Sequence, residues 1–330
     1  MKVAVVILNW NGKALLQQFL PSVVQNSPKA IIYIADNAST DDSVPFLRKN
    51  FPLVKIIQNK INGGFAKGYN DALQDLQEDI FVLLNSDVEV TEGWLQPLIQ
   101  EMEQDKKVAA LQPKILNYRK KTHFEYAGAA GGYIDVMGYP YCRGRIFETL
   151  EEDHGQYDDT KEIFWATGAC MMIRKNAFFE AGGFDEDFFA HQEEIDLCWR
   201  LYNSGLKVKA VGASTVYHLG GGTLNAMHPR KTFLNFRNSL YTVLKNAPKD
   251  KVFIIIFLRL LLDGLAGVKF LIELKPSHSA AIIRAHFQFY QHAGKMWKKR
   301  KPSPKKTKYY NNISVVFAYY LQGRKEFKRV

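Results

Sequence analysis

Short apolar runs rich in β-branched residues alternate with helix-like stretches through the first third of the chain. The runs predict strands at 3–8, 31–35, 54–58 and 80–84, and the stretches between them predict helices that include 14–25 and 44–50. Strands that alternate with helices form right-handed crossovers and a parallel sheet. We therefore expect an α/β fold with a mostly parallel central sheet that is covered by helices on both faces.

Polar side chains follow three of these strands. They are Asn9 and Asn11 after the first strand, Asp36, Asn37 and Ser39 after the second, and Asn85 and Asp87 after the run at 80–84. The carboxyl ends of parallel strands meet at one edge of a sheet, where such folds bind ligands. The small residues after Asp36 favour a tight turn whose N–H groups would grip a nucleobase and ribose. The ordinary alternative is a turn that Asp36 closes without any ligand.

Two residues are candidate metal ligands. Asp87 stands at the end of a buried strand, which suits an oxygen-preferring cation such as Mg²⁺ or Mn²⁺ bound to a diphosphate. His218 follows another β-branched run and enters a glycine-rich loop, where a neutral imidazole would complete the site. Turn capping by Asp87 and a hydrogen-bonded strand-end histidine are the alternatives.

A glycine-rich loop precedes a helical run at 59–73. The spacing from Gly63 to Gly68 matches that of a P-loop, but Tyr69 and Asn70 replace the required lysine and Ser/Thr, which excludes an NTPase motif. No G-x-G-x-x-G sequence follows a strand, which disfavours a dinucleotide-binding enzyme. Free N–H groups at the helix start would still attract phosphate.

Three carboxylates crowd the first turn of a predicted helix at about 193–204. Glu193, Glu194 and Asp196 repel one another unless they cap the helix, pair with cations or perform chemistry. A carboxylate can act as a general base when its neighbours adjust its pKa. This cluster is the strongest candidate for such a base, and capping together with pairing to Arg200 is its structural alternative.

The charge of the chain is concentrated in its last quarter. The formal net charge is +11, and residues 245–330 contain 19 Lys and Arg against 4 Asp and Glu. Such a basic segment indicates a polyanionic partner, either nucleic acid or an anionic membrane face. The three cysteines, Cys142, Cys170 and Cys198, are widely spaced and predict neither a disulfide framework nor a zinc site, which fits a reducing cytosol. The first apolar run is too short for a secretory signal.

The apolar segment 252–274 is interrupted by charged residues. With Lys251, its charges Arg259, Asp263, Lys269 and Glu273 fall within an arc of roughly 120° on a helix, which predicts a helix lying in a membrane plane rather than crossing it. Trp297 among lysines at 295–306 suits an anionic headgroup region. The alternatives are a helix packed on the rest of the protein and a solvated linker.

Taken in order, the motifs resemble the family-2 inverting glycosyltransferases of the GT-A fold, in particular a rhamnosyltransferase-like branch. The resemblance covers about residues 3–240 and rests on VVILNWNG, YIADNASTDDS, NGGFAKGYN, LLNSDVEV, WATGACMMIRKNAFFEAGGFDEDFF, EEIDLCWRL, VYHLGG and FRN. It implies a nucleotide-sugar-binding half at 1–115 and a half with the acceptor site and catalytic base at 116–228. The residues themselves predict a loop-rich, glycine-containing insertion at 116–160 and a helical, basic, membrane-associating extension at 229–330.

The resemblance also implies roles for individual residues. Glu194 would be the catalytic base, with Glu193 and Asp196 as rivals, and Asp87 and His218 would bind Mg²⁺ or Mn²⁺. The donor nucleotide would be held by Asn9, Asn11, Asp36, Asn37, Ser39, Asn62, Gly64, Asn70, Asn85 and Arg237, and the donor and acceptor pocket would be lined by Trp165, Gly168 and Ala169.

The expected reaction is inverting transfer of a sugar from dTDP-rhamnose or a UDP-hexose to a glycan hydroxyl, in the synthesis of a surface polysaccharide. The acceptor is expected to be polyprenyl-linked, which would place the enzyme in the cytoplasm on the inner face of the cell membrane. One alternative is a sugar-nucleotide nucleotidyltransferase, although only Gly12 and Lys13 resemble the glycine- and lysine-bearing loop that it needs. A nucleic-acid-binding protein leaves the carboxylates without a role, so no nucleic-acid partner is expected. A catalytically idle scaffold is the third alternative, and the oligomeric state is left open.

Overall fold

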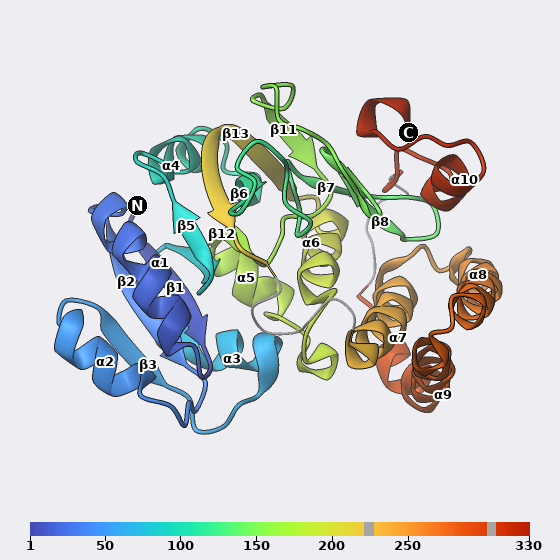
Figure 1. Cartoon of the computed structure of the whole chain (residues 1–330), viewed down its shortest axis with the longest axis horizontal. Helices are drawn as coiled ribbons and strands as arrows, with labels where there is room; N and C mark the ends of the chain where they lie inside the picture. The colour runs from blue at the N-terminus through green and yellow to red at the C-terminus, as the bar shows by residue number, and fades with distance from the viewer. Residues whose placement is uncertain (221–227, 302–307) are drawn as a thin grey trace.

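The computed structural model describes residues 1–220, 228–301 and 308–330 (Figure 1). Its strands are β1 (Val3–Asn9), β2 (Ala30–Asp36), β3 (Lys55–Gln58), β4 (Ile80–Asn85), β5 (Val88–Val90), β6 (Val108–Asn117), β7 (Gly132–Ile134), β8 (Pro140–Cys142), β9 (Arg145–Ile146), β10 (Thr149–Leu150), β11 (Thr160–Ile163), β12 (Cys170–Arg174) and β13 (Lys207–His218). Its helices are α1 (Lys13–Asn26), α2 (Ser43–Asn50), α3 (Gly64–Leu73), α4 (Leu95–Gln104), α5 (Lys175–Ala181), α6 (Glu193–Asn203), α7 (Pro229–Asn246), α8 (Val252–Ile272), α9 (Pro276–Lys298) and α10 (Val315–Tyr320). Short 3₁₀ turns lie at Glu186–Phe188 and Phe327–Arg329.

The central sheet has the strand order β11-β13-β6-β12-β4-β1-β2-β3, with β5 paired to β13. Strands β3, β2, β1 and β4 are parallel, and their register pairs Asn9 with Asp36 and Leu8 with Asn85. The polar strand ends therefore meet at one edge, as the sequence predicts. Strand β12 runs antiparallel to both of its neighbours, so the parallel order is interrupted next to β4.

Helices cover both faces of the sheet because alternate residues of β1 point to opposite sides. Val3, Val5 and Ile7 pack with Leu16 of α1 and Leu98 of α4, among other residues. On the other face, Ala4 and Val6 belong to the cluster that contains residues of α3, α5 and α6. The expected two-sided α/β arrangement is confirmed.

The predicted boundary between residues 115 and 116 falls inside β6, and the two predicted halves share one sheet. Strand β12 lies between β4 and β6, while β13 pairs with β6 along most of its length. The expectation of a loop-rich insertion at 116–160 is incomplete, since β7, β8, β9 and β10 form a small antiparallel sheet there. Buried Phe124 and Ile146 belong to the same hydrophobic cluster as one face of the main sheet. Strands of two or three residues are too short to show a hydrophobic pattern in the sequence.

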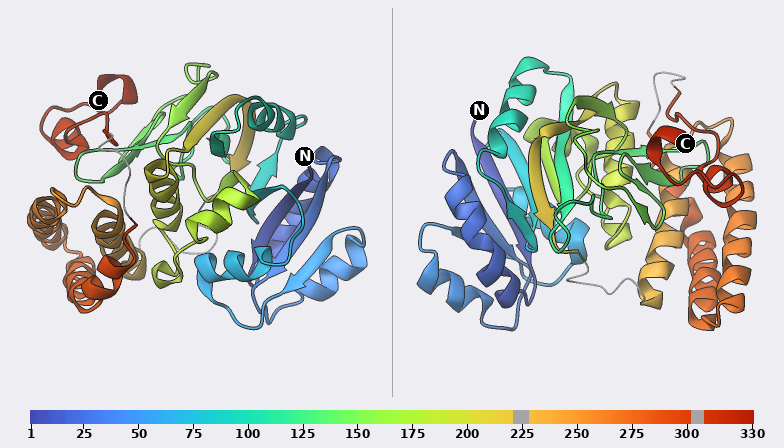
Figure 2. Two further views of the ribbon diagram at one scale, coloured as in Figure 1. Left: turned by 180° about the vertical axis from the view of Figure 1, so that it is seen from behind. Right: turned by 45° about the horizontal axis from the view of Figure 1, so that its top comes forward.

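The basic extension is helical, as expected. Helices α7, α8 and α9 gather at the end of the molecule opposite β3 and α2 (Figure 2). Helix α8 differs from the expectation, because Arg259 and Asp263 are buried against the protein while much of its apolar side is exposed. The membrane-plane and packed-helix interpretations thus each describe one side of α8. No helix among the described residues is long and apolar enough to cross a membrane. Part of the run 295–306 lies outside the described residues.

Candidate active site

The loops after β1 and β2 are joined by a hydrogen-bond network. The Asn9 amide donates to Asp36 Oδ1 at 3.1 Å and to Ser39 Oγ at 3.2 Å, and the Ser39 N–H donates to Asp36 Oδ2 at 3.0 Å. The Asn11 side chain accepts from the Thr40 N–H at 2.7 Å. Asn9 and Asp36 are buried, so they shape the loop from beneath, and Asn11 and Trp10 provide its exposed surface.

Asn37 connects this loop to the glycine-rich one. Its amide donates to Asn62 Oδ1 at 3.0 Å and to the Gly64 carbonyl at 3.1 Å, and it accepts from Asn59 at 3.1 Å. The structure thus brings together Asn9, Asn11, Asp36, Asn37, Ser39, Asn62 and Gly64, all of which were predicted to hold the nucleotide. Of these, Asn11 and Asn62 are exposed.

Gly64 has a φ of +79°, and a Cβ there would lie 2.6 Å from the Phe189 carbonyl oxygen. The same carbonyl accepts the Phe65 N–H at 2.8 Å, so the start of α3 rests directly on the segment before α6. Asn70, in contrast, is bonded to the backbone of Phe184 and to Glu186. Asn70 therefore braces the turn at 181–188 and does not face the loop of Asn62.

Asp87 and His218 lie side by side, as predicted. His218 Nε2 is 3.1 Å from Asp87 Oδ1 and 3.4 Å from the Asn85 amide nitrogen, because β5 begins at Val88 and pairs with the end of β13. On its other side, His218 Nδ1 lies 3.0 Å from Glu125 Oε2. Glu125 is not among the predicted site residues, because it lies in an irregular loop without a motif.

The two carboxylates beside His218 favour its charged form. Burial alone would lower the pKa of His218, but Asp87 and Glu125 on its two sides raise it to about 10. Burial alone would likewise raise the pKa of Asp87, but its contact with His218 lowers it below the ordinary value.

The pair of Asp87 and His218 fits a divalent metal once His218 has lost its proton, because only a neutral imidazole binds a metal. Two adjacent ligands of an octahedral ion with bonds of about 2.1 Å are about 3 Å apart, which matches the spacing of Asp87 Oδ1 and His218 Nε2. The described residues contain no cluster of three or more His, Cys, Asp or Glu side chains arranged to hold a metal. Such a two-ligand site suits a cation that also binds substrate phosphates.

The three carboxylates at the start of α6 differ in their surroundings. Glu194 is partly exposed, and its Oε2 has no hydrogen-bond partner among the described residues. Burial of the carboxyl raises the pKa of Glu194 to about 7. Glu193 is 4% exposed, and its pKa is raised well above the ordinary value by burial and by the charge of Glu194.

Asp196 has a structural role. Its carboxylate receives Lys245 Nζ at 2.9 Å, Arg200 Nε at 2.9 Å and the Asn246 amide at 2.8 Å. Although burial would raise the pKa of Asp196, Lys245 and Arg200 hold it below its ordinary range. Among the three carboxylates, Glu194 is therefore the one with the protonation equilibrium and accessibility that a general base needs.

The segment before α6 has an unusual backbone. Phe189, His191 and Gln192 have φ values of +65°, +70° and +72°, which non-glycine residues rarely adopt. Asn238 of α7 donates to the carbonyls of Phe188, Ala190 and His191 at 2.8–3.0 Å. These bonds from the extension hold the strained segment, and with it the position of Glu194.

Comparison with known proteins identifies the family of this chain. Residues 4–180 match the model of glycosyl transferase family 2. The chain belongs to this family. It is 26% identical over 239 residues to N-acetylglucosaminyl-diphospho-decaprenol L-rhamnosyltransferase of Mycobacterium tuberculosis, a match that covers 66% of the chain and 76% of the relative.

Solved structures place the family-2 chain in the GT-A fold. It aligns with S. aureus TarS 1-349 at a TM-score of 0.57 and 14% identity, covering 91% of this chain and 83% of the other. It aligns with the mannosyltransferase PcManGT of Pyrobaculum calidifontis, solved with GDP-Man and Mn²⁺, at a TM-score of 0.54 and 12% identity, covering 88% and 87%. The chain is a glycosyltransferase, as the motifs indicate.

In this glycosyltransferase a series of contacts leads from Asn85, beside His218, toward the segment before α6. The Asn85 N–H donates to the Ala169 carbonyl at 3.0 Å, and a Cβ on Gly168 would lie 3.0 Å from the Phe65 ring. Phe65 in turn bonds Phe189, close to the start of α6. Gly168 and Ala169 are therefore buried links between the two halves of the site rather than its exposed lining.

Trp165 and Arg237 also occupy positions inside the protein. The Trp165 indole donates to the Tyr133 carbonyl at 2.9 Å, and the residue is 4% exposed. The Arg237 guanidinium donates to Asn238, Gln288 and the carbonyls of Asp187 and Phe188. Arg237 thus supports the segment before α6, and this arrangement does not present it to a diphosphate.

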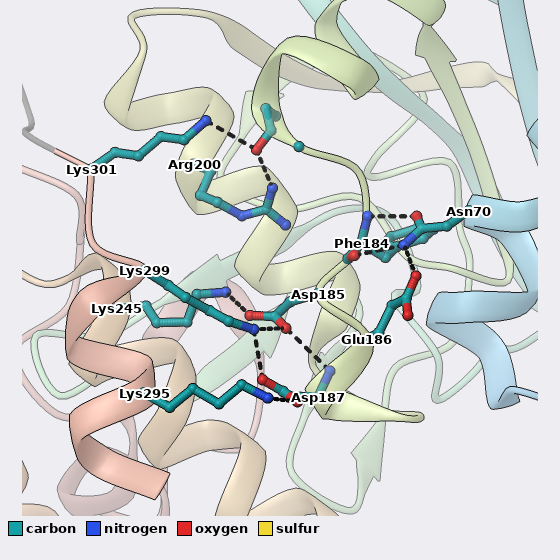
Figure 3. Close-up of a pocket in the computed structure, with 12 residues that line it drawn as sticks. Asn70, Phe184, Asp185, Glu186, Asp187, Arg200, Lys245, Lys295, Lys299 and Lys301 are labelled. Atoms are coloured by element: carbon teal, nitrogen blue, oxygen red, sulfur yellow. Dashed lines mark hydrogen bonds and ion pairs between the residues drawn. The ribbon is translucent and has the colours of Figure 1, made fainter. Parts of the chain in front are cut away.

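A charged cavity of about 460 Å³ lies between the turn at 181–188 and the end of α9 (Figure 3). Lys299 bridges Asp185 and Asp187, while the buried Lys245 joins Asp185 to Asp196. These five side chains anchor the turn and the start of α6 to the extension. The cavity is lined by these internal ion pairs, and it is separate from the metal pair.

Proposed function

We propose that this glycosyltransferase moves a sugar, with inversion, from a nucleoside diphosphate to a hydroxyl of a polyprenyl-linked glycan. The observation that carries the proposal is Glu194, a carboxylate with a pKa of about 7 and an unpartnered oxygen, which follows a segment that contacts the predicted nucleotide loop at Gly64 and Phe65. The printed name of the Mycobacterium tuberculosis relative supports a rhamnosyl donor and a lipid-linked acceptor. We favour dTDP-rhamnose over a UDP-hexose on that basis.

In the proposed reaction, Glu194 takes the proton of the acceptor hydroxyl as its oxygen attacks the anomeric carbon. The diphosphate leaves on the opposite side, so the configuration at that carbon inverts. The loops of Asn11 and Asn62 would hold the nucleotide, with Asn9, Asp36 and Asn37 fixing their shape from beneath.

Asp87 and His218 would hold the divalent cation, Mg²⁺ or Mn²⁺. When bound, the cation supplies positive charge that neutralises the departing diphosphate. The Mn²⁺ in the solved PcManGT complex supports a metal of this kind.

The experiment is a thermal-shift panel of dTDP-, UDP- and GDP-sugars, each with and without Mn²⁺. We expect one nucleotide to raise the melting temperature only when Mn²⁺ is present, because a ligand that binds the folded state stabilises it. Transfer from that donor to a polyprenyl-diphosphate N-acetylglucosamine, followed by NMR of the product, then reports the anomeric configuration. Folded protein that responds to no nucleotide, or a product with retained configuration, would contradict the proposal.

A further inference from the structure

Helix α8 exposes an unbroken apolar surface. Across an arc of about 140° of its wheel, every residue is apolar or glycine. This outward face consists of Phe253, Ile254, Phe257, Leu258, Leu261, Gly264, Leu265, Val268, Leu271 and Ile272, and all of them are exposed. Leu265 is 66% exposed and Ile272 is 77% exposed. A helix on a water-facing surface normally shows the opposite arrangement, with its apolar stripe toward the core.

Buried polar contacts fix α8 in this orientation. Arg259 donates to the Met137 carbonyl at 3.0 Å and to Ser239, and its guanidinium lies 3.7 Å from the centre of the Tyr139 ring. Asp263, fully buried, accepts from the Tyr139 hydroxyl at 3.3 Å and lies 3.2 Å from His286 Nε2. Rotating α8 to hide its outward face would leave these buried charged groups without their partners. It would also expose Val252, Ile255 and Ile256, which are now buried.

The apolar surface continues beyond α8. Phe253 stacks on Trp297 of α9, and the exposed residues of α9 include Ile283, Phe287 and Tyr290. On the other side, α10 lies close enough for the Lys269 ammonium to contact the Tyr320 ring. Figure 1 shows α8, α9 and α10 along the side of the molecule away from β3, so this surface does not cover the nucleotide loops.

The charged residues around this surface indicate what it binds. Lys251 and Lys269 are five helical turns apart, so both border the outward face on the same side, and both are exposed. The segment 245–330 around them contains 19 basic and 4 acidic residues. A second copy of the chain would bring two positively charged rims together, whereas an anionic bilayer offers apolar chains below a negative surface.

We infer that the outward face of α8 embeds in the interfacial layer of an anionic membrane. The helix lies parallel to the surface at a depth of about 5–10 Å, with Lys251 and Lys269 at the headgroups. Attachment depends mainly on apolar burial, and the lysines add attraction to anionic lipid. The inference deepens the proposed function and rests on it for its purpose, because a lipid-linked acceptor is presented at that surface.

The test is flotation of the full chain with vesicles of phosphatidylcholine, with and without phosphatidylglycerol, at low and high salt. The protein should float with the anionic vesicles at low salt and stay largely bound at high salt. Changing both Leu261 and Leu265 to Glu should weaken binding about tenfold or more, since two apolar side chains would no longer be buried. Leu53→Glu is the matched control, because Leu53 is 91% exposed on the catalytic domain and should not affect binding.

Three outcomes would overturn the inference. They are a wild-type chain that does not float, a double leucine variant that floats as well as the wild type, and complete release at high salt. A dimer in light scattering that the leucine variant dissociates, without vesicle binding, would instead assign the face to a second copy. The thermal-shift panel on the same variants separates the two proposals, since loss of attachment should leave nucleotide binding unchanged.

Discussion

The side-chain amide of Asn238 donates a 2.8 Å hydrogen bond to the carbonyl oxygen of His191, and so ties α7 to the residue three positions before Glu194. The same amide also donates to the carbonyl oxygens of Phe188 and Ala190. One buried side chain of the extension therefore holds a backbone segment with three positive-φ residues immediately before Glu194, the proposed base.

Asn238→Ala should reduce kcat on the order of 100-fold, because a misplaced base loses its alignment with the acceptor. The donor Kd should stay near the wild-type value, and the free energy of unfolding should fall by about 1–3 kcal/mol from the unsatisfied carbonyls. Asn26→Ala is the control, since it removes a single bond to the Val90 carbonyl at another place in the fold. Equal losses in kcat for the two variants would show that Asn238 has no positioning role.

The three carboxylates of α6 should respond differently to conversion to amides. Glu194→Gln should lower kcat by about 10²–10⁴-fold while melting temperature and donor binding stay unchanged, because only the proton acceptor is lost. Glu193→Gln should be far milder. Asp196→Asn should instead lower the melting temperature, since Lys245 and Arg200 lose their charged partner. If the Glu194→Gln variant transfers sugar at the wild-type rate, Glu194 is not the catalytic base.

The pH dependence of kcat/KM should report Glu194. Because burial raises its pKa to about 7, the carboxylate is ionised above that pH and protonated below it. A base must be ionised, so kcat/KM should rise with pH and level off above about pH 7. Below that pH, kcat/KM should fall about tenfold for each pH unit. A profile that stays flat down to pH 5 would contradict this assignment.

The sheet edge was predictable because its signals are local. The strand runs ending in Asn9, Asp36 and Asn85 carry their polar residues at the point where the strand stops, and parallel pairing does the rest. The pairing of Asp87 with His218 also follows from two strand ends. The roles of Asn238 and Arg237 did not follow from the sequence, because they depend on α7 packing against a segment far away in the chain.

The outward face of α8 shows the limit of a helical wheel. The wheel groups Arg259 and Asp263 with Lys269, but it does not tell which side of the charged arc meets the protein. Contacts with Met137 and Tyr139 decide that, and those residues lie in a region with no regular pattern. Glu125 was missed for the same reason.

Glu125 should tune the metal site through His218. Glu125→Gln removes the charge that lies 3.0 Å from Nδ1, and changes of this kind beside a ligand typically weaken metal affinity by about 10–100-fold. Titration calorimetry with Mn²⁺ measures the affinity directly, without relying on turnover. Glu89→Gln, at an exposed ion pair with Lys121, is the control. Unchanged Mn²⁺ affinity in the Glu125 variant would remove this residue from the site.

Lys245 should be a strong determinant of stability. Its ammonium lies between Asp185 and Asp196, and all three side chains are buried. Figure 3 shows the contact of Lys245 with Asp185. Lys245→Ala leaves two buried carboxylates without their shared partner and should cost about 3–5 kcal/mol of unfolding free energy. Lys13→Ala breaks an exposed pair with Asp42 and should cost at most about 1 kcal/mol. Urea denaturation compares the two, and similar midpoints would argue against the buried network.

The bond from the Phe65 N–H to the Phe189 carbonyl, together with the close fit of Gly64 against Phe189, has a practical consequence for protein engineering. The loop at 62–66 and the segment at 188–192 are distant in sequence but are shaped against each other. Grafting the first from a relative to change the donor would leave a mismatched partner beneath it. A functional chimera would need both pieces from the same parent, so the two form a single unit of exchange.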